Sequence, residues 1–309
     1  MKNMWDNVKM QLFYQWKANY FIILFLFVLV LCGFSSYAQY SALHQKEADF
    51  NRTMEMYKKD GITLKQALSE KLEVKKNGNS EEISNILKYD YYRVIAAKVA
   101  LNPLNAPNQI FTSIAILFLP LIFGIYSSQL ANYDFKYKTA KSQLLLNGYK
   151  NFFFSKLLSI LLVAIATVFI TIILSIGIQY VFNAIMGVQP NTSVNYLGEL
   201  PLQVVYQILV LILFGVFFFI LTTVVRSTLV SIVVLFVYML LLPNLGGYDL
   251  KNLMLLTVSK IYNTSAATMD VVSGENTNIL LGYAVILLLW GLLTVLAYRW
   301  DKNRMCPKL

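Results

Sequence analysis

The sequence predicts an all-α polytopic membrane protein with six transmembrane helices. Of its 309 residues, 57% are hydrophobic and only 14% are charged, which is too little charge to cover the surface of a water-soluble domain of this size. The apolar residues also fall in blocks of about 20, the length that a helix needs to cross a bilayer. We expect the spans at 20–37, 109–130, 157–182, 203–225, 227–243 and 278–298.

The fourth and fifth spans are nearly continuous, because the 42 residues from Leu202 to Pro243 contain one charge, that of Arg226. As a single helix they would measure about 63 Å at ~1.5 Å per residue, roughly twice the thickness of the hydrocarbon core. The chain must therefore turn back, and we expect the turn at Arg226.

Charge predicts the orientation of the spans. If the N-terminal segment, the 131–156 loop, Arg226 and the C-terminal tail lie on one side, that side carries 13 Lys and Arg residues and three acidic residues. The other side then carries 13 residues of each sign, so the net charge of +10 lies on one face. Because cytosolic loops are enriched in Lys and Arg, we expect both termini in the cytosol.

Residues 1–19 are predicted to form a cytosolic interfacial helix, because their aromatic residues give a half-amphipathic pattern. The apolar block that follows, with Ser36, Tyr37 and Ala38 after it, is also compatible with a signal peptide that would remove residues 1–38. The 19 preceding residues are longer than a usual n-region, so an uncleaved anchor helix is favoured.

Residues 38–108 are the longest polar segment, and we expect a small helical cap there on the extracellular side. Thr63 and Gln66 predict the start of one helix as a capping box. Asn79 and Glu82 predict the start of a second. Its apolar stripe would be Ile83, Ile86, Leu87, Val94 and Ile95.

Two further segments complete the expected topology. Residues 244–277 contain an apolar stretch too short to span, which we expect to lie on the outer face or to re-enter the membrane. Residues 299–309 form the cytosolic tail.

The predicted spans exclude several kinds of chemistry, since none has Asp, Glu, Lys, Arg or His in its interior. Ion-coupled transporters and intramembrane enzymes place ionisable groups at that depth. The single histidine, His44, is expected to be an ordinary surface residue, and the sequence has neither a metal-ligand cluster nor a P-loop. We therefore expect a chain that is not an enzyme, that binds no cofactor or nucleic acid, and that would depend on another polypeptide for energy.

Neutral polar residues recur every four positions in the third span and near the outer end of the fourth. They are Ser159, Thr167, Thr171, Ser175 and Gln179 in the third span, where the apolar Val163 is the one exception to the spacing, and Gln203 and Gln207 in the fourth. Residues four apart lie on one helix face. Such a face can serve helix packing, because Ser and Thr allow close approach and hydrogen bonding between helices. It can also line a translocation path, and both interpretations stay open.

The cytosolic 131–156 segment combines five lysines with apolar clusters. Its first part predicts an amphipathic helix over Tyr133–Leu144 with an Asp134–Lys138 pair at i,i+4. Asn147-Gly148 predicts a turn before the third span. Lipid anchoring alone can explain such a segment; alternatively, it presents a rigid face to a cytosolic partner.

The same segment resembles the intracellular coupling helix of permeases of the type-two ABC exporter family. That helix has an acidic residue, a Gly-Thr pair, a leucine-rich turn, a proline, a basic residue and a lysine that opens the next span. The matching residues here are Asp134, Thr139, Leu144–Leu146, Lys150 and Lys156. The tight turn at Arg226 and the apolar outer segment before the last span also resemble the family. Lys138 stands where Gly is usual, Asn147-Gly148 where Pro is, and residues 40–108 would be an elaboration.

The resemblance implies a half-transporter that forms a dimer with an identical or paralogous permease, in contact with membrane lipids. It also implies two cytosolic ABC ATPase subunits, which would bind ATP and Mg²⁺ beneath the coupling helices. The residues that would contact or position them are Tyr133, Asp134, Lys136, Tyr137, Lys138, Thr139, Lys141, Leu144 and Lys150.

These observations favour the membrane subunit of an ATP-driven exporter in a bacterial cytoplasmic membrane. Neutral, aromatic spans suit an amphipathic peptide, such as an antimicrobial peptide or toxin that is exported or expelled for self-protection, and a lipid-linked glycan is the next possibility. The alternative is a membrane sensor or immunity protein that does not transport and whose 38–108 cap binds a ligand. An intramembrane enzyme is disfavoured, because no catalytic group is present at that depth.

Overall fold

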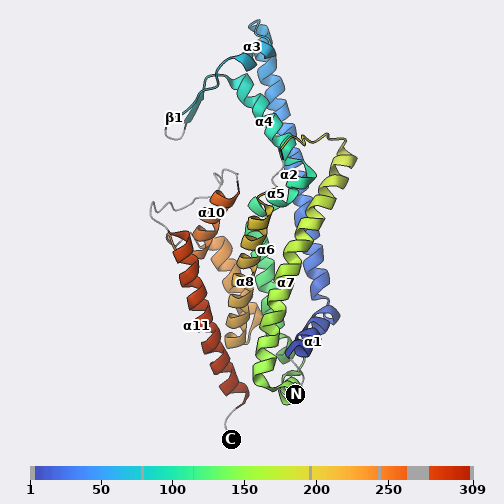
Figure 1. Ribbon diagram of the computed structural model, residues 1–309, viewed down its shortest axis with the longest axis vertical. Helices are drawn as coiled ribbons and strands as arrows, with labels where there is room; N and C mark the ends of the chain where they lie inside the picture. Colours follow the sequence, from blue (N-terminus) through green and yellow to red (C-terminus); the bar gives the residue numbers. More distant parts are fainter. Residues whose placement is uncertain are drawn as a thin grey trace. The chain divides into compact units, whose positions relative to one another are not determined.

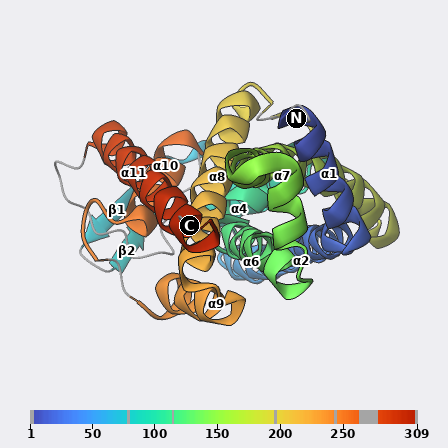
Figure 2. The same cartoon turned by 90° about the horizontal axis from the view of Figure 1, so that it is seen from below.

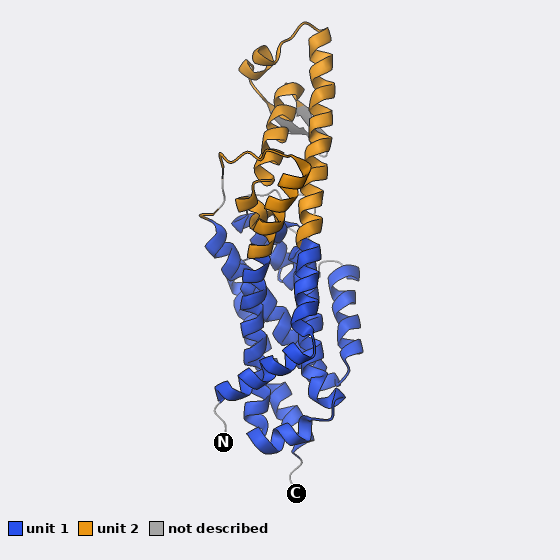
Figure 3. Ribbon diagram, turned by 90° about the vertical axis from the view of Figure 1, so that its right-hand side faces the viewer, with its two compact units in different colours: residues 1–31, 110–172, 199–309 blue, residues 32–109, 173–198 orange. Residues whose placement is uncertain are grey.

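The computed structural model describes residues 4–77, 80–113, 115–194, 197–242, 245–262 and 278–306. Figure 1 shows the helices and strands along the chain, and Figure 3 shows the two compact units into which the chain divides. Unit 1 comprises residues 1–31, 110–172 and 199–309, and unit 2 comprises residues 32–109 and 173–198. The long helices α2 (Tyr20–Lys59) and α7 (Ala140–Met186) contribute residues to both units, as does the short α5 (Ala106–Thr112).

Five described helices are long and apolar enough to cross a membrane, in keeping with the expected multi-pass membrane protein. They are α2, α6 (Ala115–Lys136), α7, α8 (Leu200–Val225) and α11 (Ile279–Met305). The predicted fifth span is a shorter apolar helix, α9 (Thr228–Phe236), which continues as the π-helical turn η2 (Val237–Leu241). Pro243, the predicted end of this span, lies outside the described residues.

The turn between α8 and α9 confirms the reversal expected at Arg226. The α8 helix ends at Val225, and Arg226 adopts a left-handed conformation with φ of 56°. Its backbone N–H donates to the carbonyl of Thr222 at 2.7 Å. Ser227 then caps α9 by accepting a hydrogen bond from the N–H of Val230. A left-handed residue followed by a serine cap is a common way to end one helix and begin the next.

Unit 1 is built around α6, which packs against α8 and α9, while α8 also packs against α11 (Figure 2). Two glycines allow the helices to approach closely. A Cβ on Gly215 of α8 would lie 2.6 Å from the ring of Phe123 and 2.9 Å from the side chain of Ile160. A Cβ on Gly124 of α6 would lie 2.8 Å from Leu235. The amphipathic helices α1 (Met4–Lys17) and α10 (Leu250–Ile261) complete the unit.

Unit 2 contains the predicted cap and is not purely helical. Its elements after α2 are α3 (Leu64–Ser69), β1 (Val74–Asn77), β2 (Ser80–Ile83), α4 (Ile86–Ala100) and the 3₁₀ turn η1 (Pro103–Asn105). The two strands pair antiparallel, with Val74 opposite Ile83. The capping box of Thr63 and Gln66 is confirmed at the start of α3. A small core of Leu43, Ala97 and Leu101 joins α2 to α4.

The predicted start of the second cap helix is wrong. Residues 80–83 form a strand, and α4 begins at Ile86 with Asn85 as its N-cap; Asn79 itself lies outside the described residues. The Asn85 side chain accepts from the N–H of Lys88 at 2.9 Å and donates to the carbonyl of Ala67 at 2.7 Å. Asn85 therefore caps α4 and ties it to α3, a tertiary contact that local sequence pattern does not reveal.

The close contact at Gly215 gives a prediction for stability. Gly215→Ala should lower the melting temperature of the detergent-solubilised protein, because the added methyl group forces the Phe123 ring and Ile160 to move, at a cost of about 1–3 kcal/mol. Gly291→Ala in α11 is the matched control, since its Cβ would meet no atom within 4 Å. The melting temperature of each variant is measured as the temperature at which heating removes half of its monodisperse peak on size exclusion. Equal melting temperatures for the two variants would contradict tight α6–α8 packing at this position.

Candidate functional site

The connection between α6 and α7 contains the segment predicted to couple to an ATPase. The α6 helix ends at Lys136, and Lys138 adopts a left-handed conformation with φ of 59°. The N–H of Thr139 donates to the carbonyl of Asp134 at 2.9 Å, and that of Lys138 donates to the carbonyl of Phe135 at 3.2 Å. These two bonds form a Schellman motif, in which glycine is the usual left-handed residue. The predicted continuous helix over Tyr133–Leu144 is therefore wrong, because the chain turns at Lys138.

A buried ion pair holds this turn against the next helix. Asp134 is 0% exposed and Lys156 is 2% exposed, and the Lys156 ammonium lies 2.6 Å from the Asp134 carboxylate. The other carboxylate oxygen accepts from the Thr139 hydroxyl at 2.7 Å. Lys156 also donates to the carbonyl of Leu130 at 3.2 Å. The predicted Asp134–Lys138 pair is wrong, because Lys138 leaves the helix and Asp134 binds Lys156 instead.

This cluster brings together three residues that carried the resemblance. Asp134, Thr139 and Lys156 are spread over 23 positions of the sequence, and the structure joins them by one carboxylate. Each partner satisfies a different oxygen, so neither charge is buried without compensation. The arrangement links the end of α6, the turn and Lys156 of α7 through one carboxylate.

A second cluster ties α7 to the α8–α9 turn and to the C-terminal end of α11. The buried carboxylate of Asp301 accepts from the hydroxyl of Tyr149 at 2.9 Å and from the guanidinium of Arg226 at 3.0 Å. The Arg226 guanidinium also lies 4.6 Å from the centre of the Phe135 ring, in α6. Three segments predicted to share one side of the membrane are therefore in direct contact.

Helix α1 contributes polar residues that sequence reasoning missed. Asn7, Gln11 and Gln15 are buried, whereas Trp5, Phe13 and Trp16 on the same helix are exposed. Gln15 donates to the Ser159 hydroxyl at 3.0 Å and accepts from the Tyr126 hydroxyl at 2.6 Å. The four-residue spacing of these amides was the available signal, but an interfacial helix is expected to direct its polar face to water. Here that face packs on α6 and α7.

The surface of the α6–α7 connection combines lysines with apolar side chains. The exposed residues are Lys136, Tyr137, Lys138, Lys141, Leu145, Leu146 and Lys150, which we call the basic–leucine face. Leu145 is 89% exposed and Leu146 is 73% exposed. Gly148, with φ of 70° and ψ of 155°, interrupts α7 just after them, which agrees with the turn predicted at Asn147-Gly148.

The remaining predicted coupling residues lie behind this face. Tyr133 is half-buried and stacks on Tyr14 of α1, with ring centres 6.2 Å apart; its ring also lies tilted against that of Tyr137, with centres 4.7 Å apart. Leu144 is half-buried at the start of α7. Gln143, one residue earlier, is buried and accepts a long hydrogen bond of 3.5 Å from Gln11. The predicted coupling residues thus divide into an exposed set and a supporting set.

The predicted translocation residues are all buried. In unit 1 these are Thr167, Thr171, Gln203 and Gln207, and in unit 2 they are Ser175 and Gln179. The hydroxyls of Thr167 and Thr171 donate to carbonyls four residues earlier in α7, at 2.7 and 2.8 Å. Gln179 donates to Asn183, whose amide donates to the carbonyl of Leu101. The two threonine bonds lie within α7, and of these bonds only the one from Asn183 joins α7 to another segment. A translocation role stays a prediction.

The single histidine shows no sign of a catalytic or metal-binding role among the described residues. His44 is exposed and contacts the ring of Tyr40 edge-on, with centres 4.5 Å apart. Within the described part of the chain, no group of three or more His, Cys, Asp or Glu residues is arranged to hold a metal ion. Protein-family models, curated proteins and solved structures give no match to this chain, so its function must be argued from its own residues.

The Asp134–Lys156 pair gives a second prediction. Lys156→Met should lower the free energy of unfolding by about 3–5 kcal/mol, because it leaves the buried charge of Asp134 without a cation to balance it. The double variant Asp134→Asn, Lys156→Met should be more stable than Lys156→Met alone, since no charge is then buried. Melting temperatures in detergent measure both. If the double variant melts below the single variant, the two residues do not depend on one another as described.

Proposed function

We propose that the chain is the membrane subunit of an ATP-driven exporter of the ABC type, and that the α6–α7 connection is its coupling site. The observation that carries this proposal is the combination of an exposed basic–leucine face with the buried Asp134–Lys156 pair behind it. Lipid anchoring alone needs an amphipathic surface but no buried ion pair beneath it.

The support behind the face suits the transmission of force. The ion pair and the Schellman turn fix the start of α7 relative to the end of α6. Displacement of the basic–leucine face would therefore move both helices together. Asp301 and Arg226 extend the same connection to α8, α9 and α11, so five helices would respond to one contact. Alternating access needs such coordinated movement of helices.

The composition of the face indicates its partner. Lysines around exposed leucines suit a groove with an apolar floor and an acidic rim, and they suit a cytosolic location. We therefore propose six spans with both termini in the cytosol, α9 with η2 serving as the fifth span. Since the chain has no P-loop, ATP and Mg²⁺ would bind to separate ATPase subunits. The permease would act as a homodimer or with a paralogue, and an amphipathic peptide or a lipid-like molecule is the proposed cargo.

One observation favours a second candidate, a sensor or immunity protein. Unit 2 contains a cavity of about 340 Å³ with mixed polar and apolar walls, in which His44, Glu47 and Lys98 supply polar groups. Glu47 and Lys98 form an ion pair at 3.2 Å, and both side chains are partly exposed. A small polar ligand could bind there without any ATPase. This candidate predicts full activity from the chain alone.

Charge reversal tests the exporter proposal. The tagged chain purified in mild detergent should bring a P-loop ATPase with it, and Lys138→Glu with Lys141→Glu should release that ATPase, because an acidic rim would then meet like charge. Lys58→Glu with Lys59→Glu is the matched control, since these two lysines are also exposed but lie at the end of α2 in unit 2. Mass spectrometry of the eluates provides the measurement.

Two results would count against coupling at this site. One is recovery of the chain without an ATPase in several detergents. The other is equal recovery of the ATPase with the 138/141 variant and with the 58/59 control.

A further inference from the structure

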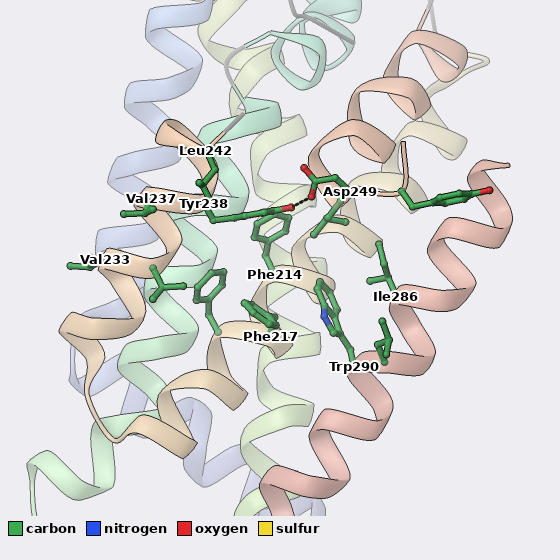
Figure 4. A pocket seen from close by; sticks show the side chains of 14 residues that line it. Phe214, Phe217, Val233, Val237, Tyr238, Leu242, Asp249, Ile286 and Trp290 are labelled. Atoms are coloured by element: carbon green, nitrogen blue, oxygen red, sulfur yellow. Dashed lines mark hydrogen bonds between the residues drawn. The ribbon is translucent and has the colours of Figure 1, made fainter. Parts of the chain in front are cut away.

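A cavity of about 510 Å³ lies within unit 1 between α8, α9 with η2, the start of α10 and α11 (Figure 4). Six aromatic side chains line it: Phe214, Phe217, Phe218, Tyr238, Tyr248 and Trp290. Phe217 stacks on Trp290 with ring centres 5.5 Å apart, and it meets Phe218 edge-on at 5.0 Å. The volume falls within the usual range for small-molecule sites, which are mostly apolar with a few placed polar groups.

One carboxylate lines this aromatic cavity. Asp249 accepts a hydrogen bond from the Tyr238 hydroxyl at 2.6 Å, and its second oxygen accepts from the N–H of Leu245 at 3.2 Å. Figure 4 shows the two side chains meeting above Phe214, Phe217 and Trp290. Asp249 is the N-cap residue of α10 but makes no side-chain capping bond. Its carboxylate is instead held by Tyr238, and the positive end of the α10 dipole favours its negative charge.

The Asp249 carboxylate retains capacity to bind a ligand. A carboxylate has about four acceptor positions, and the two bonds described above occupy two of them. Among the described residues, none forms an ion pair with Asp249 within 4.0 Å. Lys251 is the neighbouring cation, but its ammonium donates to the backbone carbonyls of Leu242 at 2.6 Å and Tyr238 at 3.3 Å, and it does not line the cavity.

The helix that carries Tyr238 has an unusual geometry at this point. Residues 237–241 form a π-helical turn, in which the N–H of Leu242 bonds to the carbonyl of Val237 at 2.9 Å. Such turns are rare overall, and those that occur are often found at functional sites. Here the turn lies beside the cavity and includes Tyr238, the residue that positions Asp249.

We propose that this cavity binds an amphipathic cation, with an amine or quaternary ammonium group near Asp249 and an apolar body among the aromatic rings. Aromatic faces attract cations through their quadrupole, and a carboxylate at the same site adds direct charge complementarity. An anionic or uncharged molecule of the same shape would gain neither interaction. The inference does not depend on the proposed function, because the cavity can bind such a ligand whether or not the chain transports it.

The test uses two ions of the same shape and opposite charge. Equilibrium dialysis of the full chain in dodecyl maltoside, with protein-free micelles as the blank, should show saturable binding of tetraphenylphosphonium and much weaker binding of tetraphenylborate. Asp249→Asn should weaken tetraphenylphosphonium binding about tenfold or more, because it removes the charge and keeps the shape. Asp6→Asn is the matched control, since Asp6 is exposed on α1 and far in sequence from the cavity, and it should bind as the wild type does.

Three outcomes would overturn the proposal. The first is no saturable binding of tetraphenylphosphonium, and the second is equal binding by Asp249→Asn and the wild type. The third is equal binding of the two ions, which would indicate an apolar pocket for a lipid chain without preference for charge. Should Asp249→Asn fail to give a monodisperse protein, Trp290→Leu tests the aromatic wall: it should weaken tetraphenylphosphonium binding about threefold or more, and unchanged binding would again contradict the proposal.

Discussion

The ion pair between Asp134 and Lys156 is the constraint on which the cytosol-facing half of the proposed mechanism depends. Two opposite charges without water are tolerated only when their remaining hydrogen-bonding capacity is satisfied, and Thr139 and the carbonyl of Leu130 supply those bonds. This requirement determines where α6 ends and how α7 begins. The exposed lysines and leucines of the connection are held in position by Asp134, Thr139 and Lys156, of which Asp134 and Lys156 are too buried to contact a partner themselves.

Features that depend on residues close together in the sequence were predictable from it. The reversal at Arg226 followed from the length of the apolar run, and the capping box at Thr63 followed from a three-residue spacing. Features that depend on distant residues were not predictable. Asp134 had a suitable partner four positions away in Lys138, yet it pairs with Lys156 from the next helix. The sequence pattern predicted that the second cap helix starts at Asn79, whereas Asn85 is the N-cap of α4. The bond from Asn85 to the carbonyl of Ala67 appears only in three dimensions.

The candidate sites show the same division. The composition of the 131–156 segment indicated a basic, amphipathic surface, which the structure contains, but its support by α1 was not foreseen. The absence of charge in the predicted spans suggested a membrane interior without ionic ligands. The structure places Asp249, from the segment after the predicted fifth span, beside rings from α8 and α11. A charge outside every predicted span can therefore face an aromatic cavity that apolar helices form.

Helix α1 packs on the protein through one face and exposes aromatic side chains on the other, which has a consequence for how the protein responds to its bilayer. The Gln15 amide is bonded to Tyr126 and Ser159, while Trp5, Phe13 and Trp16 are exposed. Aromatic residues of this kind settle at the level of the lipid headgroups. A bilayer that becomes thinner or more crowded would press on these rings. Gln15 would pass that displacement directly to α6 and α7, so membrane tension and lipid composition would act on the same helices as the proposed cytosolic partner.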